Sequence, residues 1–206
     1  MLELSFTILQ LFQAAAFLAA VWFWRSYKHT TERYFLYFLT YVVLNEALAH
    51  AVQKYLDYPN CFLYNIYIIV SFTFYFYWFG LVLKETRHMK ISMMVFLVSV
   101  GIGFFREDFF NDLWTTPMFV GSLLILFWTV RFFSTYLKDM HTERPTKDPR
   151  FWIASGLLIF HFGYLPINLM KNQLGPEDLA YGLILAMLNV VLNACYIISF
   201  LCRPKP

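Results

Sequence analysis

Glu46 is the residue whose position most clearly suggests chemistry, because it lies near the middle of a long apolar run. A carboxylate at that depth is costly in hydrocarbon, and such acids pair with another group or face a hydrated cavity. His50 follows one helical turn later, where an imidazole can exchange a proton with the carboxyl group near neutral pH. We therefore expect Glu46 and His50 to face other helices and to form the centre of a ligand-binding site.

Helical spacing places further polar side chains on similar stripes. The stripe around the central acid comprises Glu46, Ala49, His50 and Gln53, with Asn45 beside it, and later runs align His161, Tyr164 and Asn168, and then Asn189, Asn193 and Tyr196. Counted from the ends of the runs, Glu46, His161 and Asn189 lie near the bilayer midplane. The others lie mainly in the outer half, which predicts a polar cavity open to the extracytoplasmic side. The expected ligand-binding residues are Glu46, His50, Asn45, Asn65, His161, Tyr164, Asn168, Asn189, Gln10 and Gln13.

Packing is the alternative role for many of these side chains. Polar residues in helical bundles often join helices, at about 0.6 kcal/mol for each contact. This interpretation suits Asn189, Asn193 and Gln13, as well as the tyrosines of the run that begins at Cys61. Alanine-rich faces at 14–20 and 47–51 would let two helices pack closely, or would serve a homo-oligomer.

Enzymatic and cofactor chemistry lacks a specific motif. Glu46, His50 and His161 could together hold a metal ion, but their spacing is not the His-Glu-x-x-His pattern of zinc peptidases. The serines have no Gly-x-Ser-x-Gly context, and the last apolar run has no lysine that could bind retinal. We predict no catalytic residue, no metal site and no cofactor, and keep a transporter or a membrane-embedded hydrolase using those three residues as the alternative.

The elements that must position these residues are membrane helices. The 206-residue chain is 60% hydrophobic and only 14% charged, which exceeds the apolar content that a soluble domain of this size can bury. Crossing the hydrocarbon layer takes about twenty residues in a helix. One domain over residues 1–206, an all-α bundle of seven transmembrane helices, is predicted. The expected spans are Leu4 to Trp24, Tyr34 to Gln53, Cys61 to Leu83, Ile91 to Phe105, Leu113 to Tyr136, Phe151 to Met170 and Leu179 to Cys202.

Basic residues alternate between the two sides of these spans. Thirteen of the sixteen fall on one side: Arg25, Lys28, Arg33, Lys84, Arg87, Lys90, Arg131, Lys138, Arg144, Lys147, Arg150, Arg203 and Lys205. The positive-inside rule then places the amino terminus outside and the carboxyl terminus in the cytoplasm of a cell with an inner membrane. The first run follows no basic segment and is expected to remain as a span. No basic domain lies outside the spans, so we expect no nucleic-acid partner.

Tryptophans and prolines give two further expectations. Trp22, Trp24, Trp78, Trp128 and Trp152 should lie toward the cytoplasmic interface and Trp114 toward the outer one, as an aromatic belt. Pro117 and Pro166 should interrupt the fifth and sixth spans and bend them.

Three segments resemble those of a known class of membrane modules. Leu44 to His50 (LNEALAH), Asn60 to Tyr67 (NCFLYNIY) and Phe151 to Phe160 (FWIASGLLIF) look like segments of multi-pass modules common in Bacteroidota, which occur alone or fused to histidine kinases or LytTR-type regulators. The resemblance implies a sensory role in which Glu46, Asn65 and Trp152 take part. Because the chain stops four residues after Cys202, a signal would pass to a separate cytoplasmic partner.

These observations favour a membrane sensor or binding module. An extracytoplasmic small molecule, lipid or proton would engage Glu46 and His50, shift helix packing and bias a partner on the basic cytoplasmic face. A structural accessory subunit of a membrane complex is a further alternative, in which the polar residues serve packing alone.

Overall fold

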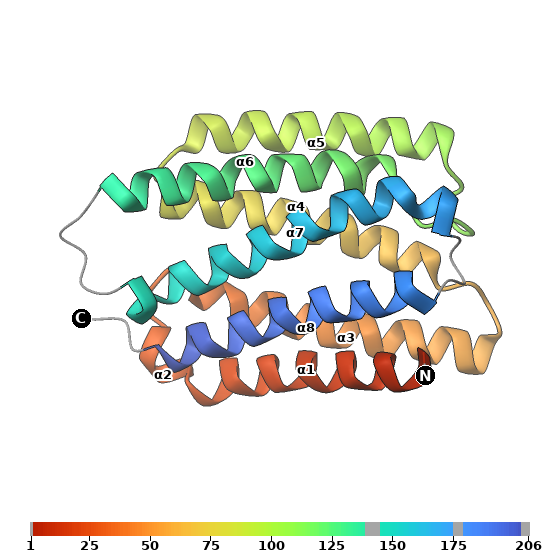
Figure 1. Ribbon diagram of the computed structural model, residues 1–206, viewed down its shortest axis with the longest axis horizontal. Helices are drawn as coiled ribbons and strands as arrows, with labels where there is room; N and C mark the ends of the chain where they lie inside the picture. The colour runs from red at the N-terminus through yellow and green to blue at the C-terminus, as the bar shows by residue number, and fades with distance from the viewer. Residues whose placement is uncertain (1, 139–144, 175–178, 203–206) are drawn as a thin grey trace. The chain divides into compact units, whose positions relative to one another are not determined.

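The protein is all-α, as the sequence predicts. The computed structural model describes residues 2–138, 145–174 and 179–202, and the chain is 87% helical (Figure 1). The helices are α1 (Leu2–Trp22), α2 (Trp24–Tyr27), α3 (Arg33–Leu56), α4 (Cys61–Val82), α5 (Thr86–Arg106), α6 (Thr116–Lys138), the short 3₁₀ helix η1 (Pro145–Lys147), α7 (Pro149–Leu174) and α8 (Leu179–Leu201).

Six of these helices, α3 to α8, are long and apolar enough to cross a membrane. The helix α1 also has 21 residues, but the apolar part whose side chains are described, Ile8–Trp22, is shorter. This architecture suggests a multi-pass membrane protein. The basic residues Arg144, Arg203 and Lys205, on which the predicted orientation partly depends, lie outside the described residues.

The helix boundaries differ from the expected spans at three points. The first helix ends at Trp22, and the chain turns at Phe23 into α2, where the hydroxyl of Tyr27 donates back to the carbonyl of Ala20. The helix α5 begins at Thr86, five residues before the expected Ile91. The charged residues that precede the apolar run are therefore part of this helix. Pro117 lies in the first turn of α6, where a missing N–H is tolerated, so it does not interrupt this helix.

The chain divides into two compact units, which are described separately. Unit 1 comprises Met1–Leu39 and Thr129–Pro206, and unit 2 comprises Thr40–Trp128. In unit 1, α8 packs against both α1 and α7. Gly156 and Gly163 of α7 let α8 approach closely, since a Cβ atom at either position would meet the side chain of Cys195 or Leu188.

In unit 2, α4 packs against α5 and α6 around large aromatic side chains. Trp128 stacks on Phe79 with ring centroids 6.1 Å apart, and its indole N–H donates to the hydroxyl of Ser92 at 3.1 Å. Trp78, Trp114 and Trp128 are all buried. These three tryptophans therefore serve core packing, and the aromatic-belt interpretation does not fit them, whereas Trp22 is 84% exposed.

Candidate functional site

Glu46 forms a hydrogen bond to a neighbouring helix within unit 2. Its Oε2 atom accepts from the hydroxyl of Tyr64 on α4 at 3.3 Å, and its side chain is half-buried. The two helices are held together beside this contact by a core of Ala49, Val52 and Leu63. The carboxyl group is thus hydrogen-bonded to a second helix, which is the arrangement that an acid inside an apolar run requires.

Aromatic rings and two unsatisfied polar atoms continue the site along the same helices. The rings of Tyr41 on α3 and Tyr67 on α4 are stacked, with centroids 6.3 Å apart and planes at 11°. The hydroxyl of Tyr41 and the side-chain nitrogen of Asn45 are buried and have no hydrogen-bond partner within the described parts of the chain. An unmade hydrogen bond of this kind costs about 1–3 kcal/mol. A polar molecule that reached these two atoms would make the missing hydrogen bonds.

The buried face of α3 differs from the expected one by about one residue of rotation. Val42, Asn45, Ala49 and Val52 are buried, Glu46 lies at the edge of this face, and His50 and Gln53 are exposed. Gln53 accepts a hydrogen bond from the side chain of Asn60 at 3.2 Å. The observed face is the more apolar one, and burying it avoids the cost of burying an imidazole. Asn45, expected at the edge, lies at the centre.

Asn65 has a structural role in this unit. Its side chain is fully buried, and its amide nitrogen donates to the carbonyls of Phe109 and Asp112, each at 2.9 Å. Its side-chain oxygen accepts from the backbone N–H of Trp114 at 2.9 Å. The residue therefore ties the loop between α5 and α6 to the interior of α4, and both of its N–H groups are already used.

The same loop carries a carboxylate that accepts hydrogen bonds at the start of the next helix. Glu107 accepts hydrogen bonds from the backbone N–H groups of Thr115 and Thr116 and from the hydroxyl of Thr115. Burial alone would raise the pKa of Glu107, but the bonds from Thr116 and Thr115 outweigh it and hold the pKa below its usual value. Glu107 thus satisfies donors at the amino-terminal end of α6.

The other expected site residues belong to unit 1. Gln13, His161 and Tyr164 are buried, Asn168 and Asn189 are half-buried, and Gln10 is exposed. The amide of Asn189 donates to the carbonyl of Leu185, and that of Asn193 donates to the carbonyl of Asn189, each at 2.9 Å within α8. These two asparagines are thus bonded to their own helix. A single site that joins Glu46 to His161 remains a prediction, because the two residues lie in different units.

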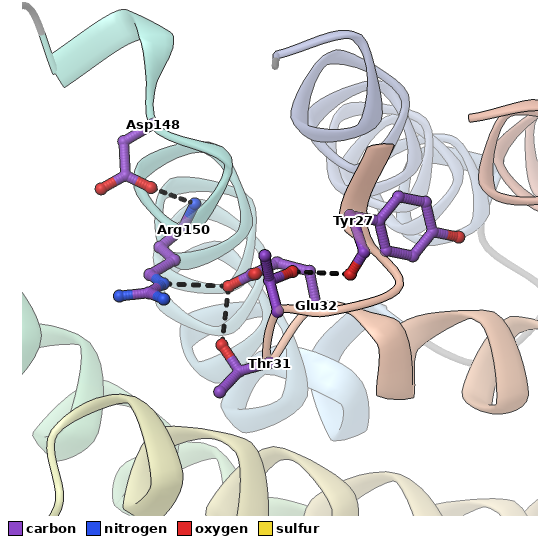
Figure 2. A network of polar contacts seen from close by, with 6 residues as sticks. Tyr27, Thr31, Glu32, Asp148 and Arg150 are labelled. Atoms are coloured by element: carbon purple, nitrogen blue, oxygen red, sulfur yellow. Dashed lines mark hydrogen bonds and ion pairs between the residues drawn. The ribbon is translucent and has the colours of Figure 1, made fainter. Parts of the chain in front are cut away.

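An ion pair between a buried carboxylate and a partly exposed arginine, which the sequence did not indicate, lies in unit 1. The carboxylate of Glu32, whose side chain is only 3% exposed, accepts from Nε of Arg150 at 3.0 Å and from the hydroxyl of Thr31 at 2.8 Å (Figure 2). The backbone N–H of Arg150 donates to Asp148 at 2.9 Å. The sequence signal is a lone acid within the basic segment 25–33, between two apolar runs.

Metal-ligating side chains do not gather in the described part of the chain, where no group of three His, Cys, Asp or Glu residues could hold an ion. Comparison with known proteins gives no further assignment: no family model, no curated protein and no solved structure matches the chain.

Proposed function

We propose that the protein is a sensor or binding module of the inner membrane, with seven spans, its amino terminus outside and its carboxyl terminus in the cytoplasm. Six long apolar helices support the membrane setting. We assign the remaining span to α1, which has 21 residues. The alternation of basic residues in the sequence supports the orientation.

The proposed ligand site lies between α3 and α4 in unit 2. The observation that carries this proposal is the hydrogen bond from Tyr64 to Glu46 beside two buried groups, Tyr41 Oη and Asn45 Nδ2, that have no partner in the described structure. A midplane acid with such neighbours is typical of a functional site. His50, one turn away and exposed, is placed to meet a ligand arriving from outside.

In this mechanism, an extracytoplasmic small molecule, lipid or proton takes over part of the hydrogen bonding around Glu46. The ligand weakens the link between Glu46 and Tyr64, and the packing of α3 against α4 changes. A ligand changes the balance between two helix arrangements only if it binds one of them more tightly, and the difference in affinity sets the size of the change. The altered packing then biases a separate partner at the basic cytoplasmic face.

A thermal-stability screen of the full chain in lipid nanodiscs tests the site. The probes are a panel of small amines, amino acids and carboxylic acids, and a compound that fits should raise the Tm of the wild type. Glu46→Gln should remove this rise while leaving the Tm without ligand close to that of the wild type. The control is Asp57→Asn, the same acid-to-amide change at an exposed position after α3. Equal rises in wild type and Glu46→Gln would contradict the proposal.

A structural accessory subunit is the second candidate. It is favoured by Asn65, Asn189 and Asn193, whose side-chain amides all donate to backbone carbonyls of the protein itself. For such a subunit, Glu46→Ala and His50→Ala should leave the amount and activity of the surrounding complex unchanged. Purification of the complex with each variant separates this candidate from the sensor.

A further inference from the structure

Arg150 is held in one orientation by a buried carboxylate. Its Nε atom donates to Glu32, and in Figure 2 its two terminal nitrogens point away from that carboxylate. The side chain is 41% exposed, and neither terminal nitrogen has a partner among the residues that the structure describes. A guanidinium fixed in this way presents a planar pair of donors, which matches two oxygens of a phosphate group.

Exposed basic side chains lie on the segments that carry or adjoin this ion pair in the sequence. Arg25 in α2, Lys28 in the turn that carries Glu32, and Lys147 in η1 directly before α7 are all exposed. The acidic side chains that the structure describes in unit 1 are Glu32 and Asp148, and both already accept hydrogen bonds from Arg150. The surroundings therefore favour a ligand with a net negative charge.

This cluster lies at the ends of helices. It lies where α1 ends and α7 begins, and both helices carry a tryptophan there, Trp22 and Trp152. Trp22 is 84% exposed, and the indole N–H of Trp152 donates to the carbonyl of Thr146 at 2.9 Å. Tryptophans at helix ends favour the boundary between acyl chains and headgroups, so we infer that this cluster lies at that depth.

We propose that Arg150, positioned by Glu32, binds the phosphate of an anionic phospholipid headgroup, and that the basic side chains of the adjoining segments, Arg25, Lys28 and Lys147, add to the attraction. The guanidinium supplies two directed hydrogen bonds to the phosphate oxygens. The adjoining basic side chains favour a headgroup without a cation, such as phosphatidylglycerol, over phosphatidylcholine. Glu32 is a positioning residue, because its carboxylate fixes the guanidinium and does not meet the lipid.

Native mass spectrometry of the full chain in detergent tests this assignment. Phosphatidylglycerol and phosphatidylcholine with the same acyl chains are titrated separately, and the wild type should prefer the former. Lys28→Gln combined with Lys147→Gln should reduce this preference by about five-fold for each basic residue removed. Neither side chain has a described partner, so this double variant should remain folded. Arg106→Gln, at the exposed end of α5 in unit 2, is the matched control and should bind as the wild type does.

The directed role of Arg150 is tested by a change that keeps its charge. Arg150→Lys should lower the affinity for phosphatidylglycerol, because an ammonium group cannot bind two oxygens of the phosphate in one plane. Glu32→Gln should produce a similar loss through the released guanidinium. The proposal is overturned if the lysine double variant keeps the wild-type preference or if Arg150→Lys keeps the wild-type affinity for phosphatidylglycerol. Inorganic phosphate that displaces the lipid at equal concentration would identify a free-anion site and would also overturn it.

Discussion

The backbone N–H of Trp114 donates to the side-chain oxygen of Asn65 at 2.9 Å, across 49 residues of sequence. Asn65 also holds two backbone carbonyls of the same loop, so one buried side chain satisfies three backbone groups at the end of α4. An unpaired backbone group in such a place is costly because no water is near to replace the bond. Loop and helix are therefore expected to unfold together.

Replacement of Asn65 by alanine should destabilise unit 2. The change leaves two carbonyls and one N–H without their partner and should lower the free energy of unfolding by roughly 2–4 kcal/mol. Thermal unfolding of the purified protein in detergent measures this loss. Asn111→Ala is the control, because Asn111 is exposed and its one partner among the residues that the structure describes is Asp108 in its own loop. An Asn65→Ala variant as stable as Asn111→Ala would contradict the anchoring role.

Glu107 should make the stability of this loop depend on pH. Its pKa is lowered in the folded protein from an ordinary value of 4.5, so its carboxylate contributes stability that is fully present above that value. The contribution is lost as the pH falls through the lower folded pKa. Glu107→Gln should therefore have a lower Tm than the wild type at pH 7, and the difference should narrow below about pH 4.5. Thermal scans of both proteins between pH 7 and pH 3 check this, and a constant difference would refute it.

The apolar runs predicted the long helices because a bilayer requires long uninterrupted apolar segments. The rotation of α3 was not predictable in the same way. Asn45 and Glu46 are consecutive and point about 100° apart on a helix, so the pattern places both near the buried face. Which of the two lies at its centre depends on the packing of Ala49 and Val52 against Leu63 of α4, which a single sequence does not specify.

The role of Asn65 could not be predicted for a related reason. A polar residue inside an apolar run signals an inward position, which the structure confirms, but its partners come from a loop more than forty residues away. The ion pair between Glu32 and Arg150 spans 118 residues, and nothing in the spacing of either residue indicates the other. Sequence therefore indicated which residues are buried in these cases better than it indicated their partners.

Close helix packing in unit 2 depends on Gly121 of α6. A Cβ atom there would lie 2.7 Å from the ring of Phe72 on α4, so Gly121→Ala forces the ring or the helix to shift. We expect a loss of roughly 1–3 kcal/mol. Gly101 of α5 is the matched control, because a methyl group at that position would have no neighbour within 4 Å. Gly101→Ala should stabilise the helix by about 0.5–1 kcal/mol. Thermal unfolding of both variants measures the two changes in stability, and equal changes would contradict close packing at Gly121.

The contact between Glu32 and Arg150 should contribute to stability independently of any lipid. Arg150→Gln leaves the buried carboxylate with Thr31 as its remaining described partner and should cost about 2 kcal/mol, less than a fully buried pair because the arginine is partly exposed. Glu32→Gln removes the charge and should cost less. If the two side chains interact directly, the double variant should lose less free energy of unfolding than the two single variants lose together. Unfolding measurements on the four proteins in lipid-free detergent give this coupling, and additive losses would show that the two groups act separately.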